Sequence, residues 1–93
     1  MMTRDQAKAA YRRVADWEKR QSDRLRDAIL VRYFGGCLCR MHNHVIAEEH
    51  GQSEGMDPLE HRRLAKLAKR FNHEQRRIWD TATRLQTAFA RYF

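Results

Sequence analysis

The residue types best suited to chemistry gather in one short stretch of this chain. Cys37 and Cys39 are separated by one residue, and so are His42 and His44. Thiolate and imidazole are preferred ligands of Zn²⁺, and four of them can surround the ion tetrahedrally. The spacing argues against such a site, because paired cysteines in structural zinc sites are usually about two to four residues apart. We therefore expect no metal and no cofactor of the chain's own, with Cys37 and Leu38 packed and the histidines on a solvated loop.

Nucleophilic catalysis has equally little support. Cys37 and His42 have the right chemistry for a nucleophile and its base, but nothing near them in the sequence supplies an oxyanion hole. The sequence contains neither a Gly-rich phosphate loop nor an H-E-x-x-H motif. We therefore expect a binding protein and not an enzyme.

The charge of the chain indicates the chemistry of a partner. The 93 residues include 19 Lys and Arg against 12 Asp and Glu, for a net charge of +7. Such an excess predicts an acidic partner: nucleic acid, an anionic membrane surface or an acidic protein. No apolar run approaches the roughly 18 residues that cross a bilayer. Two cysteines this close cannot form a disulfide framework, so we expect an intracellular protein with no transmembrane segment.

The elements that must position these residues are helices. Four glycines and one proline are too few to punctuate an all-β fold, and good helix formers dominate the composition. We expect one all-α domain over residues 1–93, either a three-helix bundle or a long helical hairpin. The expected helices span approximately 4–19, 23–34 and 57–92, and an irregular connector that contains Gly, Cys and His spans 35–56.

The first basic arm has one ambiguous stretch. An apolar stripe at helical spacing ends at Trp17, and seven polar residues follow, from Glu18 to Arg24. Ser22 is a reasonable N-cap for a new helix. We therefore favour a break near Ser22 over one continuous helix.

The last helix is better defined. Asp57 and Pro58 form a strong start signal, because Asp caps exposed amides and Pro fits the first helical position. An apolar seam with a seven-residue repeat follows, interrupted only at Glu74 and Gln75. The repeat consists of Leu64, Phe71, Ile78, Leu85 and Tyr92. Trp79 lies at the edge of this seam, so we predict that it belongs to an interface.

A basic stripe lies outside the seam. Its members are Arg62, Arg63, Lys66, Lys69, Arg70, Arg76 and Arg77. The stripe suits electrostatic binding of phosphates without sequence preference. The alternative is a solvated face, partly neutralised by Glu60, Glu74 and Asp80. Long helices in so small a chain do not bury their seams alone, so we expect a partner or self-association.

Residues in both arms resemble the LYR-motif proteins, which are small basic three-helix proteins of mitochondria. Tyr11 and Arg12 match the motif, Arg13 is its neighbour, and Ala10 stands where the motif has leucine. Phe34 matches the aromatic residue of the second helix. The stretch from Asp57 to Arg77 is similar to the closing helix of the family.

The resemblance implies an accessory subunit or assembly factor of a mitochondrial complex, such as a respiratory-chain complex. Tyr11, Arg12, Arg13 and Phe34 would then contact a protein partner. It also implies binding of the acidic acyl carrier protein on the matrix side, with the acyl-phosphopantetheine supplied by that partner. The alternative function is a small phage, plasmid or bacterial regulatory protein of the cytoplasm that binds nucleic acid or a nucleoprotein complex through its arginines.

Overall fold

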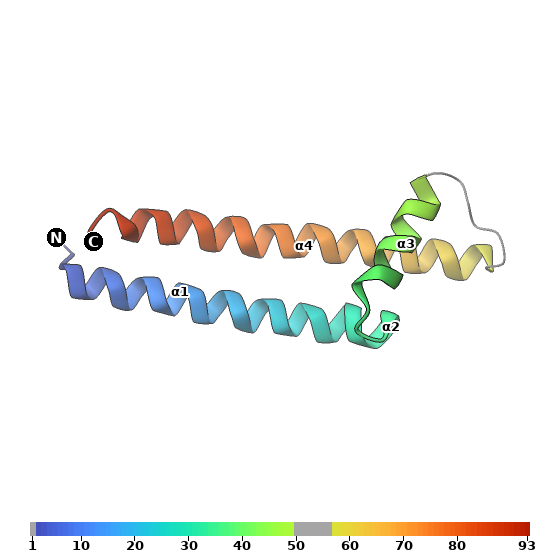
Figure 1. Ribbon diagram of the computed structural model, residues 1–93, viewed down its shortest axis with the longest axis horizontal. Coiled ribbons are helices and arrows are strands. Elements are labelled where there is room, and N and C mark those ends of the chain that lie inside the picture. The colour runs from blue at the N-terminus through green and yellow to red at the C-terminus, as the bar shows by residue number, and fades with distance from the viewer. Residues whose placement is uncertain (1, 50–56) are drawn as a thin grey trace.

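The chain folds into an elongated helical hairpin (Figure 1). The computed structural model describes residues 2–49 and 57–93, apart from the side chains of residues 48 and 49. The first arm contains α1 (Arg4–Leu25), the π-helical segment η1 (Arg26–Val31) and α2 (Arg32–Phe34). The second arm is α4 (Pro58–Ala90), and the short helix α3 (Leu38–Glu49) packs against it at the end opposite the termini. The principal extents are 59 × 22 × 16 Å. The expected all-α class is confirmed in its hairpin form.

The first arm is helical without a break from Arg4 to Phe34, so the predicted interruption between residues 19 and 23 is wrong. Ser22 does not cap a second helix. Its hydroxyl oxygen accepts a hydrogen bond of 3.3 Å from Nε2 of Gln75 on α4. The polar run of the first arm therefore faces the polar interruption in the seam of α4. This pairing lets α1 continue through a stretch that contributes little apolar surface.

Both long helices begin at a side-chain cap. Thr3 Oγ1 accepts a hydrogen bond from the Gln6 amide, and the Gln6 side-chain oxygen accepts one from the Thr3 amide, which together form a capping box. At the start of α4, Asp57 Oδ1 accepts a hydrogen bond of 3.0 Å from the Leu59 amide. The sequence prediction of 57–92 for this helix is close to the observed Pro58–Ala90, because its start signal is purely local.

The connector is more regular than its composition indicated. Gly35 and Gly36 have φ values of +62° and +79°, and the Gly36 amide donates to the Leu30 carbonyl at 3.0 Å. These two glycines adopt the left-handed backbone conformation, which ends the first arm and reverses the chain. The prediction of an irregular connector over 35–56 is wrong for residues 38–49, which form α3. The rest of the prediction, residues 50–56, lies outside the described residues.

The core is concentrated where α3 meets the hairpin. Met41 of α3 is fully buried, and Phe34 of α2 is only 2% exposed. The buried cluster consists of Ile29, Leu30, Phe34, Met41, Ala68 and Phe71. The π-helical segment contributes the adjacent residues Ile29 and Leu30. Thus all the helical segments except α1 contribute side chains to this cluster.

The seam of α4 becomes more exposed toward the C-terminus. Phe71 is buried and Ile78 is half-buried, whereas Leu85 and Tyr92 are exposed. At this far end Tyr92 is followed by Phe93, whose ring lies 5.4 Å from that of Tyr11. Among the helices of the described segments, none is both long and apolar enough to cross a membrane.

Candidate binding surface

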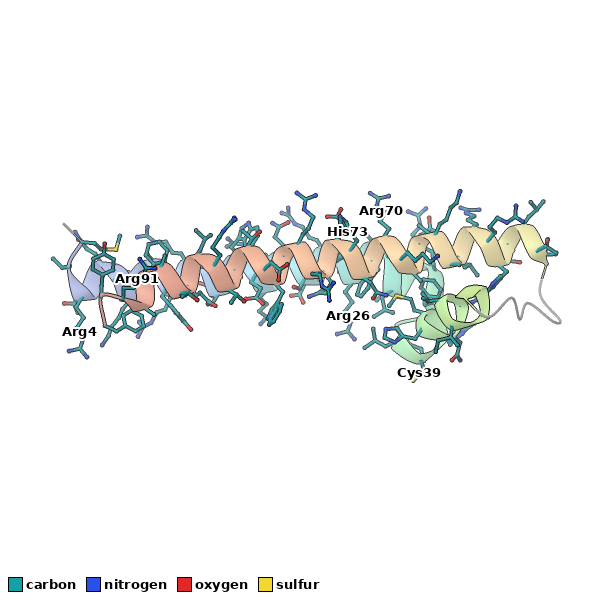
Figure 2. The ribbon with its side chains drawn as sticks, turned by 90° about the horizontal axis from the view of Figure 1, so that it is seen from above. Arg4, Arg26, Cys39, Arg70, His73 and Arg91 are labelled. Carbon is teal, nitrogen blue, oxygen red and sulfur yellow. The ribbon has the colours of Figure 1, made fainter. Side chains whose placement is uncertain are left out.

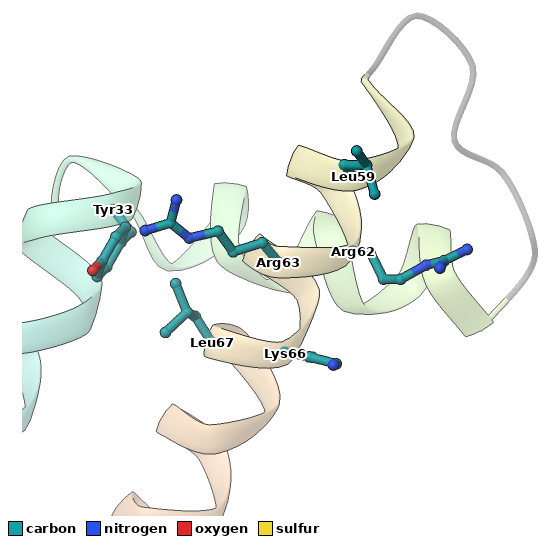
Figure 3. Close-up of a pocket in the computed structure, with 6 residues that line it drawn as sticks. All are labelled: Tyr33, Leu59, Arg62, Arg63, Lys66 and Leu67. Carbon is teal, nitrogen blue, oxygen red and sulfur yellow. The ribbon is translucent and has the colours of Figure 1, made fainter.

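A basic hollow of about 420 Å³ opens at the start of α4 (Figure 3). It is lined by Tyr33, Leu59, Arg62, Arg63, Lys66 and Leu67, and we use the name basic hollow for these six residues. Five of them come from α4, where spacings of three and four residues place side chains on one side of a helix. Tyr33 reaches the hollow from α2. The cap at Asp57 begins the helix just before this group and so holds its first turns in register.

Tyr33 organises the inner wall of the hollow. The guanidinium carbon of Arg63 lies 5.8 Å from the centre of the Tyr33 ring, and that of Arg32 lies 5.5 Å from it. Both distances fall within the range of cation–π attraction. Figure 3 shows Arg63 extending toward the ring while Arg62 and Lys66 extend in the other direction. The aromatic ring therefore restrains one cation and leaves two others directed outward.

The cations of the hollow have no carboxylate partner among the side chains that the structure describes. Elsewhere on α4, Arg77 and Glu74 form an ion pair with an N–O distance of 3.9 Å. No such pair involves Arg62, Arg63 or Lys66. Leu59 lies beside them and is 76% exposed. Positive charge next to exposed apolar surface is suited to an acidic ligand that also offers an apolar group.

The basic stripe lies on the outer face of α4, as predicted. All seven of its members are exposed, and the hollow contains three of them. Figure 2 shows Arg70 projecting outward from this helix beside His73. The stripe therefore extends the positive surface from the hollow toward the middle of the hairpin.

The residues predicted to contact a partner do not form one site. Tyr11 is half-buried against Phe93, and Arg12 and Arg13 are exposed beside it near the termini. Phe34 lies 23 residues further along a continuous helical arm, about 35 Å away at 1.5 Å per residue. Its side chain is in the core, so it presents no surface to a partner. Trp79 is 58% exposed, which agrees with its predicted position at the edge of the seam.

The cysteine and histidine residues of the connector are dispersed by helix formation. Cys39 and His42 are exposed, Cys37 and His44 are half-buried, and Figure 2 shows Cys39 at the outer edge of α3. Cys39 and His42 are three residues apart and share one face of α3, whereas His44 is two residues from His42 and points to another side. Within the part of the chain that the structure describes, no group of three or more His, Cys, Asp or Glu side chains is placed to hold a metal ion.

One histidine of this cluster has a partner that the sequence analysis missed. His44 Nδ1 lies 3.1 Å from His61 Nδ1 on α4. His61 is buried although it is polar. Its spacing from Leu64, Ala65 and Ala68 is the spacing of one helix face, which was the available signal that it faces the core.

The comparisons with known proteins are negative. No family model, no curated protein and no solved structure matches this chain. A proposal for its function therefore depends on the chemistry of the surfaces described above.

Proposed function

We propose that the protein is a non-catalytic accessory subunit that docks onto an acidic protein through the basic hollow. The observation that carries this proposal is the exposed Leu59 beside cations that pair with no carboxylate among the described side chains. Carboxylates or phosphates would satisfy the cations equally well. Burial of a leucine is favourable only against apolar groups, which a protein surface supplies and a phosphate backbone does not. An acidic protein with an apolar residue at the centre of its contact surface fits both features.

The LYR resemblance leads to a more specific form of this proposal. In that form the chain is an accessory subunit or assembly factor of a mitochondrial complex, and acyl carrier protein is the acidic partner. The exposed Arg12 and Arg13 are accessible for such a contact. Phe34 is buried beneath α3, so an acyl chain that reached Phe34 would require α3 to move.

A second candidate function is nucleic-acid binding, and the exposed basic stripe along α4 favours it. Binding of this kind would depend on counterion release and would weaken steeply as salt increases. It would depend little on Leu59, because base-independent contacts are made to phosphates.

The first experiment identifies the partner. The tagged protein is purified from its native host, and its complexes are weighed by native mass spectrometry. We expect an acidic protein; a mass that corresponds to acyl carrier protein with phosphopantetheine and an acyl chain supports the specific form. Co-purified nucleic acid with no protein would contradict the proposal and favour the second candidate.

The second experiment tests the surface with paired variants. Leu59→Ser should weaken binding of the protein partner by about 10-fold or more, since burial of a leucine contributes about 1.5–3 kcal/mol. Binding of random-sequence DNA should not change. Arg62→Glu with Lys66→Glu should abolish partner binding, whereas Lys19→Glu with Arg20→Glu makes the same charge change at exposed positions on α1 and should have a small effect. Equal losses in both charge-reversed proteins would contradict a specific role for the hollow.

A further inference from the structure

A pair of histidines joins α3 to α4. The Nδ1 atoms of His44 and His61 are 3.1 Å apart, and the ring centres are 5.2 Å apart. His44 also packs against Phe34 of α2, with ring centres 5.7 Å apart. His61 is 6% exposed, and its Nε2 has no hydrogen-bond partner in the described structure. The pair therefore lies where α2, α3 and α4 meet.

The number of protons on the pair determines whether this hydrogen bond exists. A neutral imidazole has one N–H donor and one acceptor nitrogen, whereas a protonated imidazole has two donors and no acceptor. One Nδ1 must donate and the other must accept. The contact therefore persists when the pair is neutral or carries one added proton. When both rings are protonated, two N–H groups and two positive charges face each other at this short distance.

The surroundings oppose protonation more than they favour it. Burial of His44 lowers its pKa below the usual 6.5, and the nearby His61 and Arg40 lower it further. Glu60 on α4 acts in the opposite direction and raises this pKa, but its effect is the smallest of the four. From α2 the group in contact with His44 is the Phe34 ring, which carries no charge.

We propose that the His44–His61 pair is a pH-sensitive latch that holds α3 on the hairpin and releases it on acidification. Release would uncover Met41 and Phe34, which the docked helix keeps out of solvent. The protein would then present an apolar face at low pH that is absent at neutral pH. This inference is independent of the acidic partner proposed above, since neither histidine lines the basic hollow.

The direction of the pH effect follows from proton counting. A histidine whose pKa is lower in the docked state than in the released state binds more protons after release. Docking is therefore fully favoured above pH 6.5 and weakens as the pH falls below it. If release binds one additional proton, the equilibrium constant for release rises by about tenfold for each pH unit in this window.

The test is amide hydrogen exchange on the 93-residue protein between pH 7 and pH 5, with intrinsic exchange rates corrected at each pH. Protection of the α3 amides reports the release constant, because a 12-residue helix that has left the hairpin is marginally stable in water and its amides then exchange. We expect the equilibrium constant for release of α3 to rise by up to about tenfold for each pH unit below pH 6.5. Protection of the α1 amides should stay unchanged. A release constant that is flat between pH 7 and pH 5 would overturn the proposal.

Two variants distinguish protonation of the His44–His61 pair from other effects of low pH on the protein. His44→Gln keeps a hydrogen-bonding side chain but cannot gain a charge, so the pH dependence of α3 protection should be lost. His42→Gln removes an exposed histidine from the same helix and should retain the wild-type pH dependence. An unchanged pH dependence in His44→Gln would overturn the proposal.

Imidazole NMR on the wild-type protein provides a readout that requires no variant to fold. The His44 ring should titrate below pH 6.5, because its pKa is lowered while α3 is docked. This titration should coincide with the loss of α3 protection. A loss of α3 protection that occurs without protonation of His44 would contradict the latch.

Discussion

The two halves of the hairpin bury very different side chains. The three-helix half (residues 25–49 and 57–75) contains Phe34, Met41 and Phe71 in its core. The two-helix half (residues 2–24 and 76–93) buries only Ala7 and Ala82 among the described residues. The two-helix half contains six of the nine aromatic residues, including both tryptophans, so a lack of aromatic side chains does not explain the difference. The difference lies in the presence of α3.

This comparison shows what a third helix contributes. Two helices in contact share one narrow seam, which encloses alanine but leaves larger side chains partly in solvent. Leu85 is exposed and Trp79 is 58% exposed for this reason. In the three-helix half, α3 covers the side of the seam that would otherwise be open. We therefore expect most of the stability of the protein to come from that half.

Removal of the largest core side chain should have the greatest effect. Phe34→Ala should lower the free energy of unfolding by about 3–5 kcal/mol, because it deletes a fully buried ring and leaves a cavity. Phe93→Ala removes a half-exposed ring that contacts Tyr11 and should cost about 0.5–1 kcal/mol. Urea unfolding followed by far-UV circular dichroism measures both. Equal losses would show that the two halves contribute equally.

The turn into α3 should be the next most sensitive position. Gly35→Ala should cost about 1–2 kcal/mol, because φ at this residue is +62° and alanine is strained there. Among the atoms of the described residues, only Arg40 Nη1 lies near an added Cβ, at 3.6 Å, so the cost is conformational and not a clash. Gly35→Asn is the matched variant and should recover part of the loss, since asparagine tolerates this conformation. Chemical denaturation of both variants measures their free energies of unfolding and tests whether Gly35→Ala is the less stable of the two.

The two helix caps probe the halves separately. Asp57→Ala should cost about 1 kcal/mol of global stability, since the Asp57 side chain caps the helix that carries the core. Thr3→Ala should mainly fray the first turn of α1, in the two-helix half. Residue-resolved hydrogen exchange distinguishes global from local opening. A global loss of the same size in Thr3→Ala would show that the halves unfold as one unit.

The polar contact at the boundary between the halves should have the smallest effect. Ser22→Ala removes a part-buried hydrogen bond to Gln75 and should cost about 0.5 kcal/mol. The double variant Ser22→Ala with Gln75→Leu should recover this loss, because neither polar group is then left without its partner. A double-mutant cycle in urea measures the coupling. Additive losses would show that the two side chains do not interact.

The sequence predicted a helix correctly where both its start signal and its apolar repeat were present. The start of α4 requires only Asp57 and Pro58, and the outer position of the basic stripe follows from the apolar repeat. The prediction failed for residues 18–24, where a polar run was interpreted as a break. It failed again for α3, because cysteine and histidine were interpreted as possible ligands on a loop, although Met41, His44 and Val45 have the spacing of one helix face.

The candidate sites also depend partly on local sequence and partly on tertiary structure. The cations of the basic hollow were recognisable from the sequence, but Tyr33 joins them only because the first arm folds back beside α4. The contact between His44 and His61 joins residues 17 apart on different helices. No local pattern specifies that contact, because its geometry depends on how α3 docks.

The sequence by itself therefore determined the helical class, the ends set by Thr3, Asp57 and the glycines, and the positive outer face. Each of these depends on backbone preference or on periodicity within one segment. The tertiary structure decided whether the polar run at Ser22 remained helical, whether α3 formed, and which residues were buried. Those outcomes depend on side chains that are distant in sequence, since burial and hydrogen bonding between helices exist only after the helices pack together.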